Sequence, residues 1–369
     1  MRVVAKVGTS SLTDAAGVIQ RDVIAALCDQ LATLRKHGHE VMLVSSAAIS
    51  AGVAALHLPA RPTDVLTLQA LAAAGQPRLM EQYIRELARH DLVAAQVLLV
   101  PHDFANRQQY LHARQTLARL LELGCVPIIN ENDTVANDEI RYGDNDRIAA
   151  LVAHNVSADL LILLTDTPGL YTADPRTDST AELITDVAAN DPLLAVTAGS
   201  TGTARGSGGM ASKLQAARLA SWSGVGAVIA QALRPNVIVD AVNGDSVGTR
   251  FAPSDRRLPA RKLWIGFASN VQGTVTVDPG AYRALVERGT SLLPAGVVGV
   301  QGDFHEGATV EICTPDGMVF ARGMAVSSAD VIQASAGKST RDLPARVAHE
   351  VVHRDDLVLL PHERSTHVL

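Results

Sequence analysis

Residues 126–154 read VPIINENDTVANDEIRYGDNDRIAALVAH, and this stretch contains one complete strand–loop–helix unit. The apolar run Val126–Ile129 is typical of a strand that is buried on both faces of a parallel sheet. The helical candidate Arg147–His154 follows after two clusters of acidic and carboxamide side chains, Asn130–Asp133 and Asp144–Asp146. A turn needs only one or two such residues. A turn alone therefore does not account for two such clusters in one connection.

The same alternation of short apolar runs and Ala/Leu-rich stretches continues on both sides, through about residue 250. Further strands are predicted at Val3–Val7, Glu40–Val44, Val93–Leu99, Leu160–Leu164 and Ala227–Ala230. Further helices are predicted at Arg21–His37, Leu66–Arg89, His112–Leu123 and Met210–Ser223. This alternation predicts an open, mostly parallel, three-layer α/β/α sheet with right-handed crossovers. Ligands of such sheets bind at the loops beyond the carboxyl ends of the strands.

The pattern changes after about residue 250. Residues 251–262, FAPSDRRLPARK, carry two prolines and four basic residues and are typical of a linker. Short β-branched segments separated by Pro-Gly and Pro-Asp-Gly turns follow, which predicts a small β-rich domain. The predicted boundaries are 1–255 for the α/β domain, 256–270 for the linker, 271–357 for the β-rich domain and 358–369 for a tail.

Composition excludes several classes of protein. Hydrophobic residues make up 47% of the 369 residues and aromatic residues only 3%, so the core is expected to consist of Ala, Val and Leu. The net charge of −6 disfavours a general nucleic-acid binder, because phosphate contacts need Lys and Arg. Three widely separated cysteines indicate neither a disulfide framework nor a zinc site. Without a membrane-length apolar run or a signal-peptide pattern, the chain is expected to be soluble and cytoplasmic.

Two predicted strands end in residues suited to phosphate chemistry. Lys6 lies inside an apolar strand, where an ammonium group is costly unless it meets an anion. An edge lysine whose charge reaches water is an equally good interpretation of this segment alone. Ser45 and Ser46 follow the second strand at a helix start, where a capping serine is at least as good an interpretation as a ligand-binding one.

A glycine-rich loop completes the candidate chemistry. In RGSGGMASKLQ the loop amides, the start of a helix near Met210 and Lys213 in its first turn could cradle a polyphosphate. The alternative is a flexible linker that precedes a helix. Thr165 and Asp166 follow another strand and could bond a ribose or a base, although they also suit an ordinary turn. The acidic clusters would suit the ammonium group of an amino acid, a divalent metal or plain turns.

Together these segments resemble the glutamate 5-kinases, a group within the amino-acid kinase family. The resemblance rests on KVGTS, SSAAISAG, NENDTVANDEIRYGDND, LLTDTPGLYTADPR and GSGGMASK, in this order, and on a C-terminal domain similar to the PUA fold. It implies magnesium-dependent transfer of the γ-phosphoryl group of ATP to the side-chain carboxylate of L-glutamate, the first step of proline biosynthesis. It also implies feedback inhibition by proline, and a homo-oligomer is expected.

The resemblance assigns roles to individual positions. Lys6 and Lys213 match the catalytic lysines, while Ser46, Asp133 and Asn145 match glutamate-binding positions. Asp144 and Asp146 belong to the same motif and would order a lysine or bind magnesium. The ATP site is matched by Lys6, Thr165, Asp166, Ser207, Gly208, Gly209, Met210, Ala211, Ser212 and Lys213.

One position departs from the family pattern. Ala47 stands where members usually have glycine after the second strand, and its methyl group would crowd a phosphate-binding amide or need a backbone adjustment.

Two alternative functions remain at this stage. A sister enzyme would phosphorylate the carboxylate of another amino acid with the same ATP site. An RNA-binding protein is the other, since PUA domains bind RNA elsewhere. From residue 271 onward, however, 8 Lys and Arg face 12 Asp and Glu, which disfavours contact with RNA.

Overall fold

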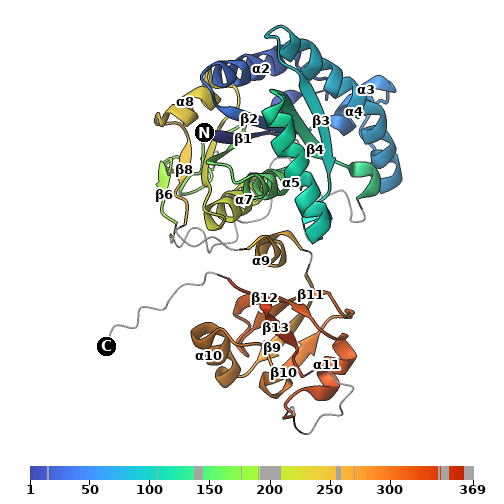
Figure 1. Ribbon diagram of the computed structural model, residues 1–369, viewed down its shortest axis with the longest axis vertical. Coiled ribbons are helices and arrows are strands. Elements are labelled where there is room, and N and C mark those ends of the chain that lie inside the picture. Colours follow the sequence, from blue (N-terminus) through green and yellow to red (C-terminus); the bar gives the residue numbers. More distant parts are fainter. Residues whose placement is uncertain are drawn as a thin grey trace. The chain divides into compact units, whose positions relative to one another are not determined.

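The computed structural model describes residues 1–14, 16–104, 106–136, 144–175, 177–189, 191, 209–254, 259–269, 271–339, 341 and 349–360. The chain divides into two compact units, Met1–Arg257 and Leu258–Leu369 (Figure 1). None of the described helices combines the length and the hydropathy that crossing a lipid bilayer requires.

The first unit is built on one twisted sheet. Among the described residues, eight strands pair in the order β3-β4-β2-β1-β5-β7-β8-β6. Their bounds are β1 Arg2–Val7, β2 Glu40–Ser45, β3 Ala94–Leu99, β4 Val126–Glu131, β5 Leu160–Thr165, β6 Asp186–Val187, β7 Gly226–Gln231 and β8 Thr249–Phe251. All neighbours from β3 to β7 are parallel, whereas β8 runs antiparallel to β7. The prediction of a mostly parallel sheet is confirmed.

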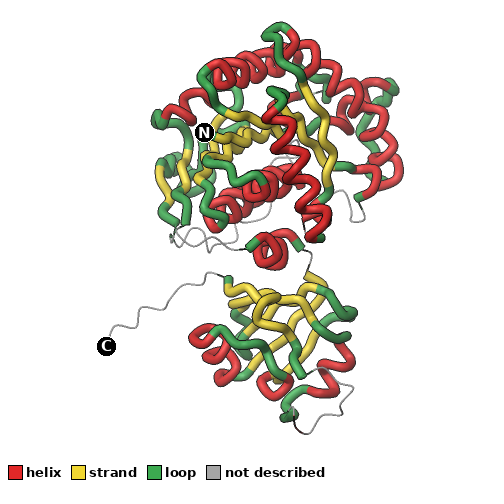
Figure 2. The backbone as a smooth tube through the Cα atoms, viewed as in Figure 1, coloured by secondary structure: helices red, strands yellow, loops and turns green. Residues whose placement is uncertain are grey.

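Helices cover both faces of this sheet, as Figure 2 shows. On one face α2 packs against β2, α4 and α8, and α4 packs against β3 and α3. On the other face α6 packs against β1, β4 and β5 and contacts α5 and α7. The bounds are α1 Thr9–Leu12, α2 Arg21–Lys36, α3 Ala48–Ala55, α4 Val65–Ala88, α5 Arg107–Glu122, α6 Asp144–Asn155, α7 Met210–Trp222 and α8 Val237–Asn243.

The main core consists of apolar side chains from the sheet and from the helices that cover it. Leu27, Leu31, Leu43 and Ile162 are at most 1% exposed, and the large ring of Tyr83 is also fully buried among them. Each fully buried aliphatic side chain of this size contributes about 1.5–3 kcal/mol to folding. A rigid sheet buried in this way fixes the positions of the loops at its carboxyl edge.

The second unit has a separate sheet and core. Its described residues form five strands in the order β10-β9-β11-β12-β13, around a core that includes Val310, Phe320 and Val352. The bounds are β9 Val271–Val277, β10 Val297–Gln301, β11 Thr309–Cys313, β12 Val319–Ala325, β13 Val352–Leu359, α9 Ala260–Leu263, α10 Pro279–Arg288 and α11 Ala329–Ser335. The predicted β-rich domain is confirmed.

The structure differs from the predicted boundaries of this unit at two points. Residues 260–268, inside the predicted linker, form α9 and the π-helix η4 (Trp264–Ala268), which pack against β13. The predicted tail also begins too early, because β13 continues to Leu359. Both segments belong to the second unit because they contribute to its packing.

Candidate active site

The carboxyl ends of β1, β2, β4 and β5 meet at one edge of the first sheet. Val7 at the end of β1 is in register with Ser45 of β2 and Leu164 of β5. Lys6, Ser46, Asn130 and Thr165 therefore come to this edge from four neighbouring strands. The chain places them together because parallel strands all end on the same side of a sheet.

Asp146 lies at the centre of a buried charge cluster. Its Oδ1 is 2.6 Å from the Nζ of Lys6, and its Oδ2 is 3.3 Å from the Nζ of Lys213. The hydroxyl of Ser212 also donates to Oδ2, at 2.7 Å. Asp146 is 0% exposed, Lys6 is 3% exposed and Lys213 is 5% exposed. Three elements, β1, α6 and α7, thus converge on one carboxylate.

The cluster perturbs the pKa values of Asp146 and Lys6. Burial by itself would raise the pKa of Asp146, but the attraction of Lys6 and Lys213 is stronger and holds that pKa below its ordinary value of 3.8. Burial lowers the pKa of Lys6 from 10.5, although Asp146 opposes this shift and Lys213 adds to it. Among the described residues, two ammonium groups thus share one buried carboxylate in a dry site.

A chain of carboxamides lies beside this cluster. The Nδ2 of Asn145 donates to the Oδ1 of Asn130 (2.9 Å) and to the hydroxyl of Ser46 (3.1 Å). Asn130 in turn donates to the Oε1 of Gln76 (2.8 Å), and Gln76 donates to the Oε1 of Gln96 (3.1 Å). The first acidic and amide cluster is thereby joined to the second.

Gln76 and Gln96 are members of this network that the sequence analysis missed. Gln76 lies on α4 and is 8% exposed, and Gln96 lies on β3. The sequence analysis looked for candidate residues directly after predicted strands, and neither Gln76 nor Gln96 follows a strand. The available signal was a buried glutamine within the apolar pattern of a long helix, which is costly unless it is hydrogen-bonded.

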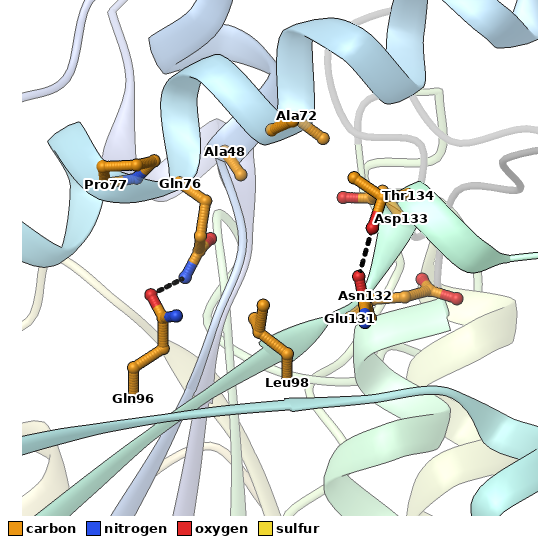
Figure 3. A pocket seen from close by; sticks show the side chains of 11 residues that line it. Ala48, Ala72, Gln76, Pro77, Gln96, Leu98, Glu131, Asn132, Asp133 and Thr134 are labelled. Atoms are coloured by element: carbon orange, nitrogen blue, oxygen red, sulfur yellow. Dashed lines mark hydrogen bonds between the residues drawn. The ribbon is translucent and has the colours of Figure 1, made fainter.

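A pocket of about 190 Å³ opens against the carboxamide chain (Figure 3). Gln76 and Gln96 point toward each other on one side, and Asn132, Asp133 and Thr134 lie on the opposite side. The full lining is Ala48, Ala72, Ala73, Gln76, Pro77, Gln96, Leu98, Glu131, Asn132, Asp133 and Thr134. Asp133, a predicted substrate residue, is half-buried there, in the short 3-10 helix η2 (Asp133–Val135). The pocket thus has polar side chains on two opposite sides and apolar side chains between them.

The glycine-rich loop ends at the start of α7. Gly209 precedes the helix, Met210 and Ala211 begin it, and Lys213 lies in its first turn. The first N–H groups of a helix lack partners within the helix, so this end carries partial positive charge. Ser207 and Gly208, which were also predicted to bind ATP, lie outside the described residues.

The remaining predicted residues fall at three places on the same edge. Thr165 is 6% exposed, and its hydroxyl donates to the Oδ1 of the exposed Asp166 at 3.1 Å. Asp144 is the first residue of α6, but its side chain lies outside the described part of the structure. Ala47 lies between β2 and α3 with φ 83° and ψ 10°, a left-handed conformation that costs a non-glycine residue about 1–2 kcal/mol.

Protein ligands for a metal ion are sparse at this edge. Across the described parts of the chain, no group of three or more His, Cys, Asp and Glu residues could hold one. Both oxygens of Asp146 already face ammonium groups. In this structure Asp146 is therefore a partner of two lysines.

Comparison with known proteins identifies the family of the chain. The model of the amino acid kinase family matches residues 1–231, and that of the PUA domain matches residues 273–346. The glutamate 5-kinase of Trichlorobacter lovleyi is 47% identical over 365 residues, which cover 98% of this chain and 97% of that protein. The glutamate 5-kinase of Herpetosiphon aurantiacus is 48% identical, covering 97% and 98%. That of Thermobifida fusca is 47% identical, covering 97% and 93%. Relatives this similar span nearly the whole chain, which therefore belongs to the amino acid kinase family, in its glutamate 5-kinase branch.

Proposed function

We propose that this kinase transfers the γ-phosphoryl group of ATP to the side-chain carboxylate of L-glutamate, the first step of proline biosynthesis. A carboxylate oxygen of glutamate attacks the γ-phosphorus, and the bond from that phosphorus to the bridging oxygen of ADP breaks. The products are L-glutamyl 5-phosphate and ADP. The observation that carries the proposal is the buried Lys6–Asp146–Lys213 cluster between a helix N-terminus and the carboxamide chain.

Lys6 and Lys213 stabilise the charge of the phosphoryl group as it moves. The transferring group spreads negative charge over its equatorial oxygens, so catalysis depends mostly on position and on electrostatic stabilisation. The two ammonium groups of the cluster provide that stabilisation in a low-dielectric environment. Asp146 is assigned a positioning role, because it contacts both lysine ammonium groups from one carboxylate.

Ser46, Asp133 and Asn145 bind glutamate. Ser46 and Asn145 are joined by a hydrogen bond, and Asp133 lines the adjoining pocket. The Asp133 carboxylate pairs with the α-ammonium group of the substrate, and the hydroxyl and carboxamide hold its oxygens. The pocket volume of about 190 Å³ suits a small amino acid rather than a peptide.

ATP lies over Thr165, Asp166 and the loop Ser207–Lys213, with its phosphates at the N-terminus of α7. Mg²⁺ would be held mainly by the nucleotide, and it would neutralise part of the negative charge of the phosphates.

Three further properties belong to the same proposal. Proline has an ammonium and a carboxylate disposed much as in glutamate, and it inhibits by occupying the Asp133 side of the site. The chain forms a homo-oligomer, and it works in the cytoplasm. Nucleic acid is not a proposed partner.

Trapping of the product with hydroxylamine tests the function. The chain is incubated with ATP and Mg²⁺ and with glutamate, N-acetylglutamate or aspartate, and hydroxamate formation is measured. Hydroxamate from glutamate, at a rate at least about tenfold above the other two, is expected. N-acetylglutamate lacks the ammonium group that the site is built to pair, and aspartate is one methylene too short to bring its side-chain carboxylate to the same point. Preference for N-acetylglutamate or aspartate would assign the chain to a sister activity.

A further inference from the structure

The turn between β2 and α3 holds a residue in a strained conformation. Ala47 has φ 83°, is 6% exposed and precedes the first residue of α3 without a side-chain capping bond. A non-glycine residue persists in this region only where its surroundings over-determine the backbone. Ser46, the preceding residue, is hydrogen-bonded to Asn145 in the proposed glutamate site. The contacts that hold Ala47 in this conformation therefore also fix the position of Ser46.

A buried hydrogen-bond chain from α4 reaches this turn. The hydroxyl of Ser45 donates to the backbone carbonyl of Ser46 at 3.2 Å and lies 2.8 Å from the hydroxyl of Tyr83. Because the Ser45 proton is used in this bond, Tyr83 is the donor to Ser45. Both side chains are 0% exposed, so water does not compete for these bonds. Burial also raises the pKa of Tyr83, which keeps its hydroxyl protonated as a donor.

The bonded carbonyl belongs to the peptide that joins Ser46 to Ala47. The orientation of this peptide plane determines φ of Ala47, since the peptide unit is rigid. Holding its carbonyl toward Ser45 therefore holds Ala47 in the left-handed region. Without that bond, alanine would gain free energy by leaving the region, whereas glycine would have no such tendency.

We propose that Tyr83 is a positioning residue for phosphoryl transfer, which acts through the Ser45 hydroxyl to hold the Ser46–Ala47 peptide in its left-handed turn. This inference rests on the proposed function for its kinetic consequence, but the structural link itself does not. Tyr83 contacts neither substrate in this scheme.

The kinetic test is a cycle of Tyr83→Phe and Ala47→Gly. Tyr83→Phe keeps the buried ring and removes only the donor, so kcat/KM for glutamate should fall about 5- to 10-fold, the worth of one buried hydrogen bond. In the Ala47→Gly background the same change should cost about twofold or less, because glycine keeps the turn without the bond. Ser45→Ala should repeat both results. The control is Ser157→Gly, which places glycine at another residue with a left-handed backbone, at φ 53°. It should not reduce the effect of Tyr83→Phe on kcat/KM.

Hydrogen–deuterium exchange of the peptide covering residues 45–52 provides a readout that does not depend on activity. Exchange should become faster in Tyr83→Phe and return toward the parent rate in the double variant. Equal kinetic losses in both backgrounds, or unchanged exchange in Tyr83→Phe, would overturn the positioning role. Failure of the unmodified chain to form hydroxamate from glutamate would instead contradict the proposed function, and the exchange result would still decide the role of Tyr83.

Discussion

At the scale of single residues, the charge balance around Asp146 explains more of the site than any other feature. One carboxylate with no exposed surface contacts two buried lysine ammonium groups, which under the proposed function stabilise the phosphoryl group. Sequence reasoning found both lysines, because a lysine in an apolar strand and a lysine after a glycine-rich loop are each unusual. It did not separate the lysine-ordering role of Asp146 from a magnesium-binding role, since only three-dimensional contacts distinguish them.

Asp146→Asn should be less stable than the parent, because removing one partner of a buried ion pair costs about 3–5 kcal/mol. The pKa of Asp146 is lowered in the folded state, so its stabilising contribution is fully present above about pH 3.8 and is lost as the pH falls through the folded pKa. Urea unfolding of both proteins between pH 7 and pH 2.5 measures this. The stability difference should narrow below pH 3.8; a difference that stays constant to pH 2.5 would show that Asp146 is not the titrating group.

Lys213→Ala should lower kcat by about 100-fold, the usual effect of removing one charge-stabilising group from a transition state. Folding should survive, because Asp146 keeps Lys6 as a partner at 2.6 Å. Lys36→Ala, on an exposed position of α2, is the matched control and should change neither kcat nor the melting temperature. A Lys213→Ala enzyme with near-normal kcat would remove Lys213 from the catalytic role.

Asp133→Ala should raise the KM for glutamate strongly and leave the KM for ATP within a few-fold. A desolvated charge pair of this kind costs about 2–5 kcal/mol when it is truncated. Inhibition by proline should weaken in the same variant, because its ammonium group would use the same carboxylate. Steady-state kinetics with each substrate, together with the melting temperature, separates the possibilities. An equal loss for both substrates with a lower melting temperature would make Asp133 a structural turn residue.

At the scale of elements, long and fully buried segments were predictable and short or polar ones were not. Most of the six predicted strands of the first sheet read as apolar runs without alternation, because both faces of a parallel sheet are covered. β8 has only three residues, too few to show a pattern. β13 escaped prediction because it lies at the end of its sheet and carries His353, Arg354, Asp355 and Asp356 in its middle. Gln76 and Tyr83 were not predicted to belong to the site, because the sequence of α4 reads as an ordinary amphipathic helix.

The crossing of α3 and α4 is the element-scale feature on which the site depends most. A Cβ atom on Gly75 would lie 1.9 Å from the carbonyl oxygen of Ala48, and one on Gly52 would lie 2.0 Å from that of Leu71. No side chain fits there, so the two helix backbones are in direct contact. This contact fixes the position of α4, and therefore of Gln76 and Tyr83, relative to the β2–α3 turn.

Gly75→Ala should destabilise the protein by about 3 kcal/mol, the upper end for overpacking, because the obstructing atoms are backbone and cannot rotate away. Displacement of α4 should also reduce kcat/KM for glutamate more than for ATP, since Gln76 belongs to the carboxamide chain. Ala74→Leu adds more bulk one residue away on an exposed position, and it should leave both quantities near the parent values. Equal effects of the two substitutions would show that the crossing has no special role.

At the scale of the whole molecule, the proposed chemistry is confined to the first of two units, each of which has its own core. Every residue proposed to bind ATP or glutamate lies in Met1–Arg257, which has its own core built from the first sheet and its helices. Leu258–Leu369 has a separate sheet and a separate core. The sequence predicted this division from the change of strand spacing after residue 250. It could not place the first helical segment of the second unit, because ARKLWIGFA begins with basic residues that resemble a linker.

A chain that ends at Arg257 should therefore fold and keep its kinase activity. Its core residues are buried within the unit itself, so the truncated chain retains the packing that supports the carboxyl edge of the sheet. The expected result is a cooperative urea transition, with kcat and both KM values within about threefold of the full chain, since no proposed contact to substrate is removed. The matched control is Leu258–Leu369 alone, which should fold cooperatively and form no hydroxamate. A truncated chain that unfolds cooperatively but has lost activity would show that the PUA domain contributes to the site.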